Sequence, residues 1–108
     1  MAATRYTVEL TESAWRDLAE LDDYWTARGE PERGRQYVRE LFDFAEAQLS
    51  DPLRARSGRR VRVAVIPGTL EITAFGAYRL IYRIEEDSGT VLLLRCWHSH
   101  RREPPADV

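Results

Sequence analysis

Two apolar runs near the carboxyl end, residues 78–84 (YRLIYRI) and 91–97 (VLLLRCW), are separated by the short polar segment EEDSG. Runs of this length joined by a glycine-containing turn predict a β-hairpin. Side chains alternate between the two faces of a strand, so the pairing register decides which residues share a face. If Glu86 faces Thr90, one face is almost entirely apolar and the other carries the arginines.

This register predicts a core face and an arginine-bearing face. The predicted core face comprises Leu80, Tyr82, Ile84, Leu92, Leu94 and Cys96, and the other face comprises Arg79, Ile81, Arg83, Leu93, Arg95 and Trp97. A register shifted by one residue would bury unpaired arginines among leucines, at a large cost in free energy. We expect another chain or a nucleic acid to cover the mixed face. The alternative is a solvated ladder of arginines neutralised by acids such as Glu71.

The first half of the chain predicts a short strand followed by two amphipathic helices. Residues 5–10 alternate as a strand, and Thr11 is a suitable N-cap for the first helix. Gly29 ends that helix, Pro31 suits the first turn of the second, and Asp51 precedes the proline that stops it. Two helices joined by so few residues form an antiparallel hairpin, whose aromatic residues we assign to the core.

The remaining segments complete a meander. Residues 61–66 and 69–75 predict two further strands before the final hairpin, with turns at proline and glycine. The predicted fold class is α+β: an N-terminal strand and an antiparallel two-helix hairpin packed on a C-terminal antiparallel sheet. Residues 1–108 form one domain, since the length matches a single core, and the tail at about 103–108 is expected to fray.

Charge divides unevenly between the two halves of the chain. Residues 1–53 contain 6 arginines and 12 acids, whereas residues 54–108 contain 10 arginines and 6 acids. All 16 basic residues are arginine, whose planar guanidinium suits carboxylate or phosphate partners. A basic second half therefore indicates an anionic partner, either a nucleic acid or an acidic peptide.

Several classes of protein are disfavoured by what the sequence lacks. There is no apolar run of membrane-spanning length and no apolar leader at the N-terminus, so we expect a cytoplasmic protein. The single cysteine, Cys96, cannot form an internal disulfide, and His98 with His100 makes a poor metal site. Neither a metal nor a cofactor is expected.

The order of elements and two motifs resemble the RelE/ParE superfamily of bacterial toxins from type II toxin–antitoxin modules. The resemblance covers about residues 6–103. Its most specific parts are the Tyr-Arg-x-x-Tyr strand beginning at Tyr78 and the Arg-x-Trp-His ending followed by two arginines. The residues that carry it are Tyr78, Arg79, Tyr82, Arg95, Trp97, His98, Arg101 and Arg102.

The superfamily divides by mechanism, and the division matters for this chain. RelE-like members cut messenger RNA in the ribosome, and for that activity Arg79, His98 and Arg101 match nuclease positions by motif. This chain has no lysine and no tyrosine after Tyr82, however, and Glu71 is the only base we can suggest. ParE-like members bind and poison DNA gyrase. The ending resembles ParE more than RelE, so we favour the ParE-like function and keep the RelE-like nuclease as the alternative. A bare RNA-binding or scaffold domain is a third class.

Both toxin hypotheses imply a cognate antitoxin and therefore a hetero-oligomer. The antitoxin is expected to be acidic where it contacts the toxin and to fold on binding. The expected target of the toxin is DNA gyrase, or the ribosome with its messenger RNA in the alternative. The predicted face for antitoxin or target comprises Arg79, Arg83, Arg95, Trp97, His98, Arg101 and Arg102. The outer surface of the helix hairpin is a second docking surface to consider.

Overall fold

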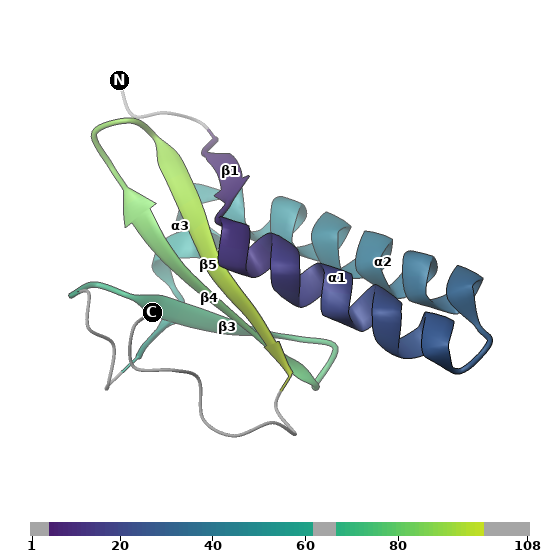
Figure 1. The fold of residues 1–108 in the computed structure, drawn as a ribbon. Helices are drawn as coiled ribbons and strands as arrows, with labels where there is room; N and C mark the ends of the chain where they lie inside the picture. Colours follow the sequence, from purple (N-terminus) through teal and green to yellow (C-terminus); the bar gives the residue numbers. More distant parts are fainter. Residues whose placement is uncertain (1–4, 62–66, 99–108) are drawn as a thin grey trace.

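A computed structural model describes residues 5–61 and 67–98 of the 108-residue chain (Figure 1). The elements are β1 (Thr7–Leu10), α1 (Glu12–Ala27), α2 (Pro31–Leu49), α3 (Pro52–Arg56), β2 (Arg59–Arg60), β3 (Leu70–Ala74), β4 (Tyr78–Glu85) and β5 (Thr90–His98). The predicted α+β class and the order strand, helix hairpin, sheet are therefore confirmed. Most of the expected strand at 61–66 and the tail at 103–108 lie outside the described residues.

The helix hairpin forms where local signals place it. The side chain of Thr11 accepts a hydrogen bond from the backbone N–H of Ala14 at 3.1 Å and so caps the first turn of α1. Gly29, at φ +77°, provides the left-handed residue between the helices, and Pro31 begins α2. Gly34 lets the helices approach closely, since a Cβ there would lie 2.8 Å from Asp22 Oδ1.

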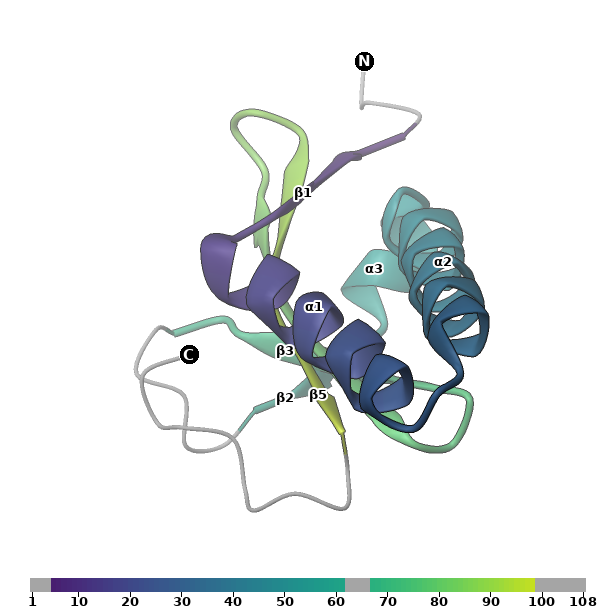
Figure 2. The same cartoon turned by 45° about the vertical axis from the view of Figure 1, so that its right-hand side comes forward.

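The described strands form one five-stranded sheet in the order β1-β5-β4-β3-β2. Helices α1 and α2 lie over one face of it (Figures 1 and 2). Strands β2 to β5 are antiparallel neighbours, as a meander requires, but β1 pairs parallel to β5 and reaches only Thr90 to Leu93. The sequence predicts only that the proline after Asp51 ends the second helix, but the short helix α3 begins there, because Asp51 accepts from the N–H of Leu53 at 3.0 Å and proline suits a first helical turn.

Beyond Leu93, the edge of β5 that faces away from β4 has no paired strand among the described residues, and α1 lies along that edge instead. The hydroxyl of Thr11 donates to the carbonyl of Leu94 at 2.9 Å, and the N–H of Cys96 donates to Asp17 Oδ2 at 3.0 Å. These side chains satisfy edge groups that would otherwise be open to pairing with another chain. From Leu94 to Cys96, α1 therefore takes the place that an added strand would need.

The predicted register of the β4–β5 hairpin is correct for one half of the hairpin and wrong for the other. At the open end Arg79 pairs with Trp97 and Ile81 with Arg95, as predicted, whereas near the turn Glu85 rather than Glu86 pairs with Thr90. The two registers meet at a bulge beside Ile81.

The bulge changes which leucines face the helices. Leu93 belongs to the core beneath the helices and Leu94 to the opposite face, the reverse of the prediction, and Leu92 also lies opposite the core. The turn, with Gly89 at φ +64°, determines the pairing close to it. Leu94, which has no partner on β4, is the extra residue of the bulge. It shifts the register by one residue, so that Arg95 stays out of the core.

Most of the core lies between the helices and the sheet. It is built from fully buried side chains such as Leu41, Leu49, Leu80 and Leu93. A smaller cluster on the opposite face contains Ile81 and Leu94, with Val61, Leu92 and Trp97 packed against them. Ile81 and Leu94 are only 0% and 8% exposed, so this second cluster is itself buried, and Leu92 and Trp97 at its border are partly buried.

Tyr82 is buried where β4 passes α3. Its hydroxyl donates to the carbonyl of Ala55 at 2.5 Å, and burial raises its pKa to about 12, so the phenol stays protonated. Gly58 makes this contact sterically feasible. A Cβ at residue 58 would lie 2.0 Å from the Tyr82 hydroxyl oxygen.

Gly58→Ala is therefore expected to destabilise the protein by about 1–3 kcal/mol, because a fully buried tyrosine has no room to yield. Chemical or thermal unfolding measures this. In a Tyr82→Phe background the hydroxyl is gone, so the same substitution should cost less. An equal cost in both backgrounds would contradict the proposed contact.

Candidate functional site

The face of the sheet opposite the helices is the first candidate site, and we term it the arginine face. It comprises Arg59, Glu71, Arg79, Ile81, Arg83, Leu92, Leu94 and Trp97. Register brings these side chains together, because directly paired residues on neighbouring strands point to the same side. Its charged groups border the small apolar cluster around Ile81 and Leu94.

Glu71 is the buried acid of this face. Its two carboxylate oxygens accept from Arg79 Nε at 2.6 Å and from an Arg59 Nη at 2.9 Å. Burial alone would raise the pKa of Glu71, but the hydrogen bonds and charges of Arg79 and Arg59 outweigh it and hold that pKa below its usual value. Glu71 is therefore an ionised bridge between two arginines.

Arg83 is less fully satisfied. One Nη donates to Glu85 at 2.8 Å, but its Nε is buried and has no hydrogen-bond partner among the described residues. An unpaired buried donor in a native fold requires an explanation, and an absent binding partner is one. Arg83 is thus the residue of this face whose bonding is most clearly incomplete.

Arg95 contacts a helix, whereas Arg79 and Arg83 bond within the sheet. The guanidinium of Arg95 reaches past the edge of β5 to Asp17 on α1, with Nε and Nη2 donating to the two carboxylate oxygens at 2.8 and 2.9 Å. The guanidinium carbon also lies 4.8 Å from the centre of the Trp97 ring. Asp17 is only 3% exposed in its side chain, so the pair links helix to sheet in a buried setting.

His98 does not join the arginine face. It pairs with Tyr78 while Arg79 pairs with Trp97, so His98 and Arg79 project from opposite faces of the sheet. The His98 ring packs edge-on against Tyr78, with centroids 4.9 Å apart. The other two predicted residues, Arg101 and Arg102, lie outside the described residues.

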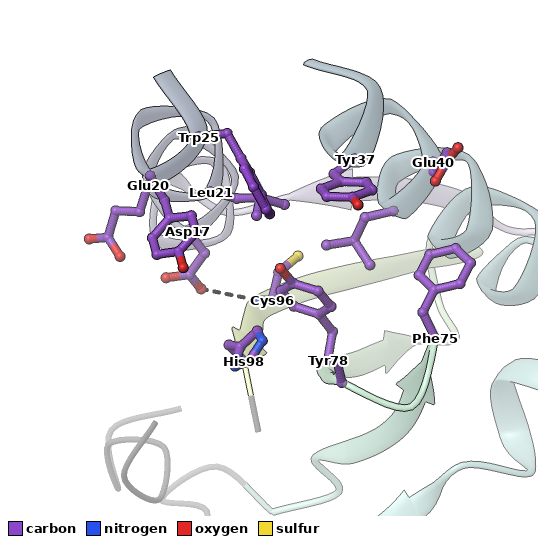
Figure 3. A pocket seen from close by; sticks show the side chains of 13 residues that line it. Asp17, Glu20, Leu21, Trp25, Tyr37, Glu40, Phe75, Tyr78, Cys96 and His98 are labelled. Atoms are coloured by element: carbon purple, nitrogen blue, oxygen red, sulfur yellow. Dashed lines mark hydrogen bonds between the residues drawn. The ribbon is translucent and has the colours of Figure 1, made fainter. Parts of the chain in front are cut away.

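A pocket of about 610 Å³ lies between α1, α2 and the open end of the β4–β5 hairpin (Figure 3). We term it the hairpin pocket. Trp25 and Tyr37 approach each other from the two helices, and Tyr78 and Phe75 come from the sheet side (Figure 3). Cys96 lines it as well. Burial, with the nearby charge of Asp17, raises the pKa of that thiol to about 12, so it is no nucleophile at neutral pH.

This pocket was missed by the sequence prediction, which assigned the aromatic residues of the hairpin to the core. Tyr24 and Tyr37 are in fact 49% and 39% exposed. Their spacing on the helices resembles that of core positions, and only the placement of the β3–β4 turn beside them creates a pocket. The sequence signal that could have indicated this pocket is a helix hairpin with more aromatic residues than one apolar face requires.

Among residues 5–61 and 67–98, no helix is long and apolar enough to cross a membrane. The same residues contain no group of three or more histidine, cysteine, aspartate or glutamate side chains arranged to hold a metal ion.

Known proteins resemble this chain along nearly its whole length. The family described as "ParE toxin of type II toxin-antitoxin system, parDE" matches residues 8–103. Toxin RelG of Mycobacterium tuberculosis is 36% identical over 94 residues, which cover 86% of this chain and 90% of RelG.

Two solved structures extend the comparison to three dimensions. The toxin–antitoxin complex RelBE2 of M. tuberculosis contains a chain with 32% identity and a TM-score of 0.63, covering 96% of this chain and 95% of that one. The chromosomal ParDE system of P. aeruginosa shares the fold, with a TM-score of 0.66 at 19% identity, covering 89% of this chain and 98% of that one.

A two-helix hairpin on a small sheet, with a full-length match to toxin sequences, defines the class as type II toxins. The chain belongs to the RelE/ParE toxin superfamily.

Proposed function

We propose that this toxin is ParE-like and arrests growth by binding DNA gyrase and poisoning it. One observation carries the proposal: Glu71, the buried carboxylate of the arginine face, and Glu85 beside it are each already paired with arginine. Glu71 bridges Arg59 and Arg79, and Glu85 accepts from Arg83. A surface built in this way is suited to binding.

Cleavage of RNA by this face would need a group that removes a proton from the ribose 2′-hydroxyl. A general base works best when its pKa lies near the working pH. The pKa of Glu71 is lowered, and both of its oxygens are occupied, so it is poorly suited to that role. Arg79 and His98 also point away from each other, which disfavours the nuclease set suggested by their motif.

The RelE-like nuclease remains the second hypothesis because of sequence similarity. The 36% identity to toxin RelG and the 32% identity to a chain of the RelBE2 complex exceed the 19% identity to the ParDE structure. Under this hypothesis Arg79 would contact the scissile phosphate, and the ribosome with its messenger RNA would be the target. Both hypotheses place the target in the cytoplasm.

The proposed partner is a cognate antitoxin, which would make a hetero-oligomer with this chain. The titles of the RelBE2 and ParDE structures describe toxin–antitoxin assemblies of related proteins. An acidic segment that folds on binding would suit the arginine face, since it could pair with Arg83 and cover the partly buried Leu92 and Trp97. Arg101 and Arg102 remain predicted contributors to the same interaction.

Purified protein is expected to inhibit gyrase supercoiling or to trap cleaved DNA, and to leave ribosome-bound messenger RNA intact. Arg83→Ala should weaken this inhibition by roughly tenfold or more while the melting temperature stays within a few degrees of wild type. Arg16→Ala, on the exposed side of α1, is the matched control and should change neither property.

Expression in a bacterial host should stop growth, and the neighbouring antitoxin should restore it. Defined cuts in messenger RNA on the ribosome, with gyrase unaffected, would replace the gyrase proposal with the nuclease. Normal growth with soluble protein present would contradict both activities in that host.

A further inference from the structure

The hairpin pocket has the size and the lining of a site for a small organic molecule. Its volume of about 610 Å³ lies within the range of roughly 300–1,000 Å³ that is typical of small-molecule sites. Aromatic side chains form much of its wall: Tyr24 and Trp25 come from α1, Tyr37 from α2, Phe75 from the β3–β4 turn and Tyr78 from β4. These rings are distant in the sequence, so only the fold brings them around one cavity (Figure 3).

Carboxylates stand at two opposite sides of this aromatic wall. Glu20 belongs to α1 and Glu40 to α2, and Figure 3 shows aromatic rings of both helices between them. Asp17 also lines the pocket, but the two hydrogen bonds from Arg95 neutralise its charge. The described residues of the lining include no arginine. The pocket therefore presents two separated negative charges with an apolar surface between them.

Rings of this wall already attract cations within the chain. The guanidinium carbon of Arg28 lies 3.6 Å from the centre of the Tyr24 ring, and that of Arg33 lies 5.1 Å from the centre of the Trp25 ring. Ammonium and guanidinium groups are drawn to the negative face of an aromatic ring. Aliphatic carbon also gains free energy when such a wall removes it from water. A ligand that combines positive charge with an apolar chain therefore suits this wall in both respects.

Phe75 gives an independent indication of a ligand site. Its φ of +53° is a left-handed conformation that bulky side chains rarely adopt, and the residue is 60% exposed. Residues held in such conformations cost free energy and cluster at active sites and ligand sites. The ring of Phe75 lies beside Phe44, with centroids 5.2 Å apart, and lines the pocket. The fold thus holds an aromatic ring at this cavity in spite of the cost.

We propose that the hairpin pocket binds a linear aliphatic polyamine, whose terminal ammonium groups pair with Glu20 and Glu40 and whose methylene chain lies against Trp25 and Tyr37. A metal dication would match the two charges but not the apolar wall between them. A neutral apolar molecule would match the wall and leave the carboxylates without a counter-charge. The proposal concerns the free chain and does not depend on the target proposed for the toxin.

Calorimetric titration of the full chain with α,ω-diamines, from diaminopropane to diaminododecane, tests the proposal. The affinity should rise by about fourfold for each methylene group that becomes buried, and it should stop rising once the diamine reaches both carboxylates. The monoamine of the best length should bind about fivefold more weakly and the diol of that length about twentyfold more weakly, since they lack one and two ion pairs. The melting temperature should rise in the same order, because these ligands bind the folded state.

Charge variants locate the two ends of the ligand. Glu20→Gln and Glu40→Gln should each weaken the best diamine by about fivefold and remove most of its advantage over the monoamine. Asp43→Asn, the same kind of change on α2 outside the pocket lining, is the matched control and should leave both affinities unchanged. All three side chains are exposed, so the melting temperatures of the variants without ligand should stay within a few degrees of wild type.

Tyr37→Leu tests the wall between the two charges. Leucine keeps an apolar side chain at this exposed position but removes the ring, so every diamine should bind at least about threefold more weakly. The preference for two charges over one should remain, because Glu20 and Glu40 are still present. A variant that lost the preference as well would contradict the assignment of charge and wall to different residues.

The absence of binding by any diamine at millimolar concentration would overturn the proposal. So would affinities that follow charge alone, with no dependence on chain length and no response to Tyr37→Leu, since that pattern describes nonspecific attraction to an acidic surface. Equal binding of the diol would replace the polyamine with a neutral ligand. The titrations measure neither growth nor gyrase activity, so their failure leaves the proposed target intact, and a protein without toxicity can still pass them.

Discussion

Arg95→Ala is expected to lower the free energy of unfolding by about 3–5 kcal/mol, the range for breaking a buried ion pair by removing one partner. The substitution leaves the carboxylate of Asp17 buried without its guanidinium partner, although the N–H of Cys96 still donates to it. One of the bonds that hold α1 along the edge of β5 is lost with it, while those of Leu94 to Thr11 and of Cys96 to Asp17 remain. For a domain of this size, the melting temperature should fall by more than about 10 °C.

Arg83→Ala is the matched control for this experiment, because it removes the same side chain from the same sheet without disturbing a buried acid. Its effect on stability should be about 0.5 kcal/mol or less. The double variant Asp17→Ala, Arg95→Ala should cost less than the sum of the two single changes. If Arg95→Ala instead melts near the wild-type temperature and loses only target or antitoxin binding, then Arg95 acts as the binding residue that its place in the sequence predicts.

Leu93→Ala is expected to cost about 2–5 kcal/mol through the cavity it leaves. Leu93 is 1% exposed and belongs to the main core between helices and sheet. Leu94→Ala should cost less, about 2 kcal/mol, since Leu94 lies in the small cluster on the arginine face, where the neighbouring side chains have more freedom to close the gap. Unfolding in urea measures both variants under the same conditions.

The comparison of these two leucines tests the bulge directly. If the register of the open end, with Arg79 opposite Trp97, continued to the turn, Leu94 would lie beneath the helices and Leu93 on the arginine face. A distinctly larger loss for Leu94→Ala than for Leu93→Ala would therefore support that register and contradict the bulge. Leu94→Ala should also weaken binding at the arginine face, whereas Leu93→Ala should affect binding only through stability.

The helix hairpin could be predicted from the sequence because its signals are local. Thr11 caps α1, Gly29 separates the helices, and Pro31 begins α2, all as expected from the preferences of these residue types. The strands of the final hairpin were also predictable, since apolar runs of this length between turn residues have few alternatives. The parallel pairing of β1 with β5 had no comparable local signal.

The arginine face was predicted in part, and the hairpin pocket was not predicted at all. Alternation along β4 places Arg79 and Arg83 on one face whatever strand lies beside them. The pocket requires the β3–β4 turn to meet two helices, and its aromatic residues have the spacing of ordinary core positions. Periodicity describes one element at a time, so it cannot identify a surface shared by three.

The sequence by itself determined the helix hairpin, the strand runs and the alternation that separates Arg79 and Arg83 from the core, because each depends on contacts within one element or one turn. The tertiary structure alone decided the register change beside Ile81 and the bond between Arg95 and Asp17. The bulge reconciles a pairing imposed by the Gly89 turn with the cost of burying arginine at the other end of the hairpin, and that balance involves every layer of the fold. Asp17 and Arg95 are 78 residues apart in the chain, and only the packing of α1 along the edge of β5 brings the two charges together.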